Sequence, residues 1–195
     1  MKKRVAVLIS GGGSNMTALI EAAKAQDYPA EIVVVVSNRP DALGLVRARE
    51  AGIATALVDH TAFGKDREAF ERALDAALHA HRIEVVCLAG FLRLLTPWFV
   101  DRWSGRMINI HPALLPHFKG LDTHRRALEA GAGEHGATVH FVSVGMDEGP
   151  VILQRAVPVL GSDTEASLAA RVLEVEHQIY PQALRLVAEG RARLP

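Results

Sequence analysis

The chain has 195 residues, with 22 lysine and arginine residues against 22 aspartate and glutamate residues and a formal net charge of zero. This balance provides no basic surface for nucleic acid or for an anionic membrane, so small-molecule partners are expected. Because 49% of the residues are hydrophobic, the chain can bury one large core, and we expect a single domain over residues 1–195.

The expected location is cytoplasmic. The apolar run Val5–Ile9 near the N-terminus is too short for a signal peptide or a membrane span. Cys87 is the only cysteine, so no internal disulfide is possible, and its apolar surroundings predict a buried, inert thiol. The sequence leaves the choice between a monomer and a homodimer open.

Strands and helices alternate through the first half of the chain. Predicted strands are Arg4–Ser10, Glu31–Ser37, Thr55–Val58, Val85–Ala89 and Met107–Ile110. The predicted helices between them are Met16–Ala25, Asp41–Ala51, Gly64–Arg82 and Thr96–Trp103. This alternation predicts an α/β fold with a mostly parallel, doubly wound sheet and helices on both faces.

The pattern changes in the C-terminal half. After a predicted helix at Thr123–Ala130, strands at Ala137–Val142 and Val151–Val159 flank the loop SVGMDEGP, which indicates an antiparallel pair added to the sheet. Residues Thr164–Glu189 predict one or two helices, since Pro181 is a possible break.

The segment MINIHPALLPHFKG, residues 107–120, is the best indication of function. Asn109 and His111 lie two apart on a strand that ends in a loop, so both side chains point the same way at its carboxyl end. An amide donor beside a titratable ring suits acyl or formyl transfer, in which an oxygen gains charge while a proton moves. The alternative is structural: Asn109 caps a turn and His111 packs against prolines.

The loop from Gly11 to Asn15 joins the first strand to the first helix, where backbone N–H groups favour a phosphate. Met16 stands where a dinucleotide fingerprint needs glycine, and no Walker lysine follows, so a monophosphate is the better fit. The alternative is a tight turn in which Ser14 caps the helix.

Several charged residues have two interpretations. Asp147 could orient His111 if its loop folds over the fifth strand, or it could be a solvated turn residue. Arg67 and Arg93 could hold carboxylates or cover apolar surface. Glu176 could be a charge on a helix surface.

The sequence does not favour a metal or a protein nucleophile. His79 and His81 diverge on a predicted helix, no H-E-x-x-H motif exists, and one cysteine cannot form a thiolate cage. No G-x-S-x-G elbow surrounds a serine. Direct attack by one substrate on another is therefore expected.

Six segments, in order and spacing, resemble the phosphoribosylglycinamide formyltransferases, which belong to the folate-dependent formyltransferases. They are LISGGGSN, VVCLAGFLRLLTPWFV, MINIHPALLPHFKG, HGATVHFV, MDEGPVILQ and RVLEVEHQIYP. The resemblance implies formyl transfer from 10-formyltetrahydrofolate to the amine of glycinamide ribonucleotide in purine synthesis, without a metal. It also implies that residues 1–105 hold the ribonucleotide phosphate and residues 106–195 carry catalysis and folate binding.

The resemblance also assigns site residues. It makes Asn109, His111 and Asp147 the catalytic residues, with Asn109 and Asp147 also touching folate. It assigns ribonucleotide binding to Gly13, Ser14, Asn15 and Glu176. It assigns folate binding to Arg67, Leu92, Arg93, Leu94, Leu95, Ser143, Val144, Gly145 and Met146. The family usually has a polar or small residue where this chain has Gly12, so a side-chain contact is absent there.

Three alternatives remain. A formyltetrahydrofolate hydrolase uses similar residues but carries an additional N-terminal domain, whereas the first strand here begins at residue 4. A transfer-RNA formyltransferase needs a further C-terminal domain and a basic surface, and the chain ends at Pro195 with no net charge. A non-catalytic nucleotide-binding module would keep the phosphate loop without turnover.

Overall fold

A seven-stranded sheet forms the centre of the computed structural model, which describes residues 1–194. The strands are β1 (Lys3–Ile9), β2 (Ala30–Ser37), β3 (Ala54–Leu57), β4 (Val85–Leu88), β5 (Met107–His111), β6 (Glu134–Phe141) and β7 (Val151–Pro158). The helices are α1 (Ser14–Ala23), α2 (Leu43–Glu50), α3 (Arg67–Ala80), α4 (Pro97–Arg102), α5 (Thr123–Glu129) and α6 (Glu165–Ala188), with a short 3₁₀ helix η1 (His60–Phe63).

The strand order is β3-β2-β1-β4-β5-β6-β7. Strands β1 to β5 pair in parallel, whereas β6 pairs antiparallel with β5 and β7 antiparallel with β6. The predicted α/β fold with an added antiparallel pair is therefore confirmed. The chain moves outward from β1 to β3 and then returns to β4, so the carboxyl ends of β1 and β4 flank a topological switch point, where ligands of such sheets collect.

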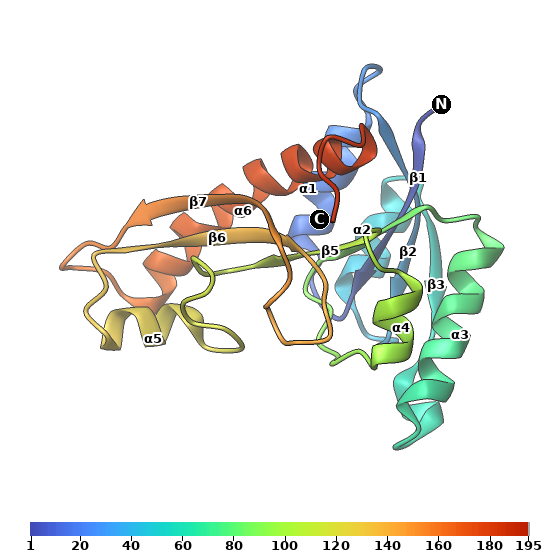
Figure 1. The fold of residues 1–195 in the computed structure, drawn as a ribbon, viewed down its shortest axis with the longest axis horizontal. Helices are drawn as coiled ribbons and strands as arrows, with labels where there is room; N and C mark the ends of the chain where they lie inside the picture. The colour runs from blue at the N-terminus through green and yellow to red at the C-terminus, as the bar shows by residue number, and fades with distance from the viewer. Residues whose placement is uncertain (195) are drawn as a thin grey trace.

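Helices cover both faces of the sheet (Figure 1). Along β1, Val5, Val7 and Ile9 enter the apolar core that contains buried residues of α1, α2 and α6. Ala6 and Leu8 point the other way, into the core that contains buried residues of α3 and α4. Because residues alternate between faces, a strand buried on both sides is apolar throughout.

Helix α6 continues through Pro181 as one helix, which settles the choice left open by the sequence. Its buried Tyr180 donates hydrogen bonds to the carbonyls of Leu88 in β4 and Ile108 in β5, at 2.8 and 3.2 Å. Tyr28 donates to the Pro181 carbonyl at 2.7 Å. The Tyr180 contacts fix α6 against the sheet where β4 meets β5, and the Tyr28 contact fixes it to the segment between α1 and β2.

The predicted helix Gly64–Arg82 was wrong at its start. The chain first forms η1, turns at Gly64 with φ 56°, and begins α3 at Arg67. Asp66 caps α3, because its side chain accepts a hydrogen bond from the Ala69 N–H at 2.9 Å. This cap places Arg67 in the first turn of α3.

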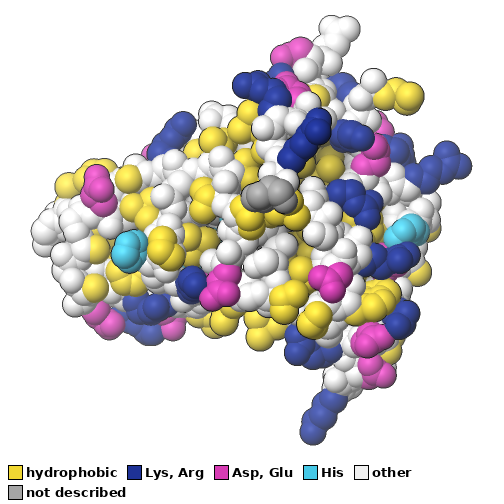
Figure 2. Space-filling model, viewed as in Figure 1, with side chains coloured by type: hydrophobic (Ala, Val, Ile, Leu, Met, Phe, Trp, Pro, Cys, Tyr) yellow, Lys and Arg dark blue, Asp and Glu magenta, His cyan; other side chains and the backbone are white. Residues whose placement is uncertain are grey.

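Cys87 is fully buried, as predicted, and burial raises the pKa of its thiol to about 12. Basic and acidic side chains are intermixed over the face shown in Figure 2, in agreement with the equal counts of 22 and 22. Within residues 1–194, no helix combines the length and apolar character needed to cross a bilayer.

Candidate active site

The carboxyl end of β5 carries Asn109 and His111, two residues apart on one strand. His111 is buried, and its Nε2 lies 2.9 Å from the Phe118 carbonyl. A carbonyl can only accept, so Nε2 carries a proton and donates. This contact fixes the plane of the ring and turns Nδ1 toward the loop between β6 and β7.

Asp147 in that loop lies beside His111. Its Oδ2 is 3.4 Å from His111 Nδ1 and accepts a hydrogen bond from the Gly120 N–H at 2.9 Å. A Cβ on Gly149 would lie 1.7 Å from the Phe141 carbonyl oxygen, so only glycine allows the loop to turn back this closely. The structure thus brings Asp147 to the histidine, as expected for a loop that folds over β5, and not as a solvated turn residue far from it.

His140 of β6 is a member of this cluster that the sequence analysis missed. Its Nδ1 donates to the Phe141 carbonyl at 2.9 Å, which leaves Nε2 to accept from the Asn109 side-chain amide at 3.4 Å. Burial is the main cause that lowers the pKa of His140, so the ring is held neutral, as this acceptor role requires. Its Nε2 is also 3.7 Å from Asp147 Oδ1.

These contacts combine an amide donor, an imidazole and a carboxylate in one nearly buried group. The side chains of His111, His140 and Asp147 are 6%, 3% and 12% exposed. A protonated His111 could donate to both the Phe118 carbonyl and Asp147, and charge interactions are strengthened by exclusion of water. The group can therefore stabilise a developing oxyanion and move protons.

The glycine loop before α1 lies on the other side of the switch point. Gly13 occupies the N-cap position with φ 72°, and no side chain caps the helix, so the alternative in which Ser14 acts as the cap is wrong. Asn15 donates to Glu176 Oε2 at 2.6 Å, and thereby joins α1 to α6. Glu176 is only 7% exposed, and burial raises its pKa; the interpretation as a helix-surface charge is also wrong.

Of the two arginines that could hold carboxylates, Arg93 belongs to the segment Leu92–Leu95 and Arg67 of α3 contacts it. Arg67 Nη2 donates to the Leu94 carbonyl, and the Arg93 guanidinium stands 5.7 Å from the centre of the Phe70 ring. Leu92 and Leu94 are 68% and 64% exposed. The segment therefore presents apolar side chains to solvent while its backbone is held by α3.

The segment from Ser143 to Met146 precedes Asp147 and also exposes apolar side chains. Val144 and Met146 are 58% and 54% exposed. Exposed leucine, valine and methionine side chains on loops around a polar cluster are suited to cover a flat, partly apolar ligand.

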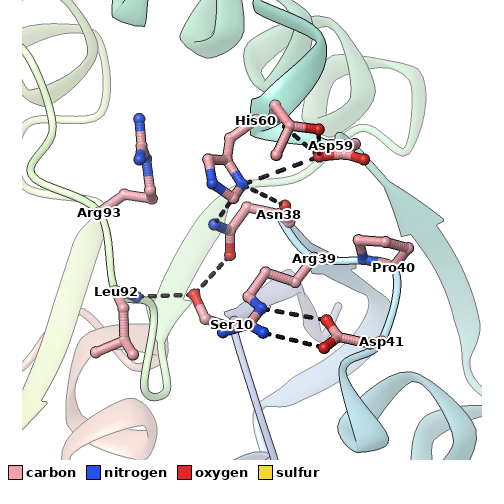
Figure 3. Close-up of a pocket in the computed structure, with 10 residues that line it drawn as sticks. Ser10, Asn38, Arg39, Pro40, Asp41, Asp59, His60, Leu92 and Arg93 are labelled. Atoms are coloured by element: carbon pink, nitrogen blue, oxygen red, sulfur yellow. Dashed lines mark hydrogen bonds and ion pairs between the residues drawn. The ribbon is translucent and has the colours of Figure 1, made fainter. Parts of the chain in front are cut away.

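A cavity of about 550 Å³ lies at the carboxyl ends of β1, β2 and β3, with Leu92 and Arg93 in its wall (Figure 3). At its base Ser10 donates to the Asn38 side-chain oxygen at 2.5 Å and accepts from the Leu92 N–H at 2.8 Å. Asn38 also contacts His60, whose Nδ1 is 2.8 Å from the Asn38 carbonyl. The network ties the segment that begins at Leu92 to the end of β1, directly before the glycine loop.

In residues 1–194, no group of three or more His, Cys, Asp or Glu side chains is placed to hold a metal ion. His124 and His135 do form a close pair, with 3.2 Å between Nδ1 and Nε2. Burial is the main cause that lowers the pKa of His135 to about 4, so this pair stays neutral and packs against Phe118.

Fold and site define an α/β group-transfer protein, and residues 3–184 match the formyl transferase family. The chain belongs to this family. It is 49% identical over 190 residues to phosphoribosylglycinamide formyltransferase of Escherichia coli, which covers 97% of this chain and 89% of that protein. A crystal structure of phosphoribosylglycinamide formyltransferase from Brucella melitensis has a TM-score of 0.93 and 50% identity, with 100% of both chains covered.

The chain is also 49% identical over 193 residues to the human trifunctional purine biosynthetic protein adenosine-3. That match covers 99% of this chain but only 19% of the human protein, so the chain spans about a fifth of that relative's length.

Proposed function

We propose that the chain transfers the formyl group of 10-formyltetrahydrofolate to the amine of glycinamide ribonucleotide, giving the N-formyl ribonucleotide and tetrahydrofolate in purine biosynthesis. The observation that carries the proposal is the contact of 3.4 Å between His111 Nδ1 and Asp147, beside Asn109 and at the end of β5. The relatives named for this reaction match nearly the whole chain.

In the proposed reaction the ribonucleotide amine attacks the formyl carbon, and the carbonyl oxygen becomes an oxyanion. The Asn109 amide donates a hydrogen bond to this oxygen, the positive charge of a protonated His111 stabilises it, and Asp147 balances the charge on the imidazole. The carbon–N10 bond of the folate then breaks. The amine loses a proton and N10 gains one, and Asp147 helps to relay them through water.

His140 serves as a positioning residue in this scheme. Its neutral Nε2 accepts from the Asn109 amide, and this contact selects the orientation of the amide and leaves its second N–H free. An amide that is fixed before the reaction need not reorganise when the oxyanion forms, which lowers the barrier.

We place the ribonucleotide phosphate on the loop of Gly13, Ser14 and Asn15, at the N-terminus of α1, where unpaired N–H groups and the helix dipole favour a dianion. Glu176 would accept from a ribose hydroxyl with Oε1, the carboxylate oxygen that Asn15 does not use. Burial removes water from the Glu176 carboxyl and thereby raises its pKa. A hydrogen bond from a ligand hydroxyl would replace part of that lost hydration.

We place the folate between the exposed segments that contain Leu92–Leu95 and Ser143–Met146. Its pterin would be covered by the leucine, valine and methionine side chains, and Arg67 and Arg93 would bind the carboxylates of its glutamate. No metal takes part. In this arrangement, residues 1–105 mainly hold the phosphate, and residues 106–195 supply the catalytic group and one wall of the folate site.

The test is release of tetrahydrofolate from 10-formyltetrahydrofolate by the purified chain, with and without glycinamide ribonucleotide. Release that requires the ribonucleotide supports the transferase. Release without it would indicate a hydrolase, and no release under either condition would indicate a binding module; both outcomes contradict the proposal.

A further inference from the structure

Helix α2 packs against the glycine loop at Gly44. The Gly44 N–H donates to the Gly11 carbonyl at 2.9 Å, which satisfies one of the free N–H groups at the start of α2. A Cβ on Gly44 would lie 2.4 Å from Ile9 Cδ1 and 3.1 Å from the Gly11 oxygen. Only glycine therefore allows α2 to approach the loop this closely.

One turn further along α2, Arg47 reaches the next peptide of the loop. Its Nη1 donates to the Gly12 carbonyl at 2.8 Å. The contact joins residues that are 35 apart in the chain, and the arginine side chain is exposed, so packing does not dictate its position. A guanidinium has five N–H donors and carries a permanent charge, so this is a charge-assisted hydrogen bond.

The two contacts determine which way the N–H groups of the loop point. In a trans peptide the C=O and the following N–H point in opposite directions. The Gly11 and Gly12 carbonyls both point toward α2, so the N–H groups of Gly12 and Gly13 point away from it. In residues 1–194 neither of these N–H groups has an acceptor within the protein.

The loop needs this support because Gly11, Gly12 and Gly13 are consecutive glycines. Glycine populates both signs of φ, so a run of three has many conformations of similar energy. A Cβ at Gly12 would find only Arg47 Nη1 within 4 Å, at 3.9 Å, so side-chain packing does not hold this peptide. The hydrogen bond from Arg47 supplies an external anchor.

We propose that Arg47 is a positioning residue for the ribonucleotide phosphate. By holding the Gly12 carbonyl it keeps the Gly13 N–H directed at the phosphate, and its charge polarises that peptide so that the N–H becomes a stronger donor. The inference rests on the proposed function, because it assumes that this loop binds the phosphate. It adds a residue of α2, a helix that the sequence analysis did not connect with the site.

The test compares Arg47→Met, Arg47→Lys and the matched control Arg49→Met. Arg49 is an exposed arginine of the same helix, and its Nη1 lies 3.5 Å from Thr55 Oγ1, away from the loop. Each methionine variant loses one positive charge from α2. Comparing the two variants therefore cancels the general effect of that charge on binding of an anionic substrate. The kinetic measurements are kcat and the two KM values, one for the ribonucleotide and one for the folate donor.

Arg47→Met should raise KM for the ribonucleotide roughly tenfold, as expected for loss of a charged hydrogen bond, with kcat and the folate KM nearly unchanged. Arg47→Lys should recover part of the loss, and Arg49→Met should match the wild type. Equal KM values in the two methionine variants would overturn the inference. A lower kcat together with an increase in both KM values would also overturn the inference, because general damage to the structure produces that result.

A binding measurement separates this inference from the proposed reaction. Calorimetry with ribose 5-phosphate requires no formyl transfer and no folate, and it reports on binding of the phosphate and the ribose. Weaker binding by Arg47→Met than by Arg49→Met supports the role of Arg47 even if the wild type fails to formylate the ribonucleotide. Equal binding by both variants contradicts that role even if the wild type is fully active.

Discussion

Replacing Asp147 by Asn removes one charge from the catalytic group with almost no change of shape. The Asn side-chain oxygen can still accept from the Gly120 N–H, which Asp147 Oδ2 now does at 2.9 Å. The fold of the loop should therefore persist, and the melting temperature should change little. What is lost is the attraction between the carboxylate and a protonated His111.

The size of this loss follows from the distance of 3.4 Å between Asp147 Oδ2 and His111 Nδ1. Two unit charges at that separation, with an effective dielectric constant of about 20, attract by about 5 kcal/mol. The amide dipole of Asn keeps part of this energy, so the barrier should rise by about 3 to 4 kcal/mol, which lowers kcat by roughly 100-fold to 1000-fold.

Single-turnover formyl transfer at saturating substrates measures this effect without contributions from product release. Glu148→Gln is the matched control, because it removes the neighbouring carboxylate, which instead pairs with Lys119 at 2.8 Å on the surface. An exposed ion pair of this kind contributes little to the stability of the loop, so Glu148→Gln should keep the wild-type rate. A near-wild-type rate for Asp147→Asn, or an equal loss in both variants, would refute the reasoning.

Three further predictions concern the surrounding residues. His140→Phe removes the acceptor for the Asn109 amide and should lower kcat roughly tenfold to a hundredfold while circular dichroism stays unchanged; an unaltered kcat would exclude the positioning role. Gly149→Ala places a Cβ 1.7 Å from the Phe141 oxygen, so calorimetry should show a lower melting temperature along with lost activity, and a wild-type melting curve would contradict the close approach. Burial raises the pKa of Glu176, so the folded wild type loses stability as pH rises from the unfolded pKa of this carboxyl through its folded pKa. Glutamine does not titrate, so the melting temperature of Glu176→Gln minus that of the wild type should increase from acidic to neutral pH. A difference that stays constant with pH would contradict the raised pKa.

Much of the fold could be predicted because its signals are local. Apolar runs that alternate with amphipathic segments specify β1 to β5 and their helices, and the loop SVGMDEGP marks the antiparallel pair. The start of α3 was predicted too early because helical periodicity extends over Gly64, whereas the boundary depends on the cap formed by Asp66. Continuity through Pro181 depends on the packing of α6 against the sheet, which no local pattern contains.

The site was harder to predict because it depends on contacts between distant segments. Asn109 and His111 could be paired from their spacing on one strand. Their relation to His140 requires the register of β5 with β6, in which Asn109 lies opposite His140. Burial of Glu176 likewise depends on how α6 meets α1, and Arg47 reaches Gly12 only because Gly44 lets α2 approach.

The most direct test of formyl transfer follows the carbon itself. The chain is mixed with 10-formyltetrahydrofolate labelled with carbon-13 in the formyl group and with excess glycinamide ribonucleotide, and the label is followed by NMR. Direct attack by the amine predicts that the label passes quantitatively to the formamide of the ribonucleotide, with no formate. Label that accumulates in formate, or that remains on the folate, would contradict the account.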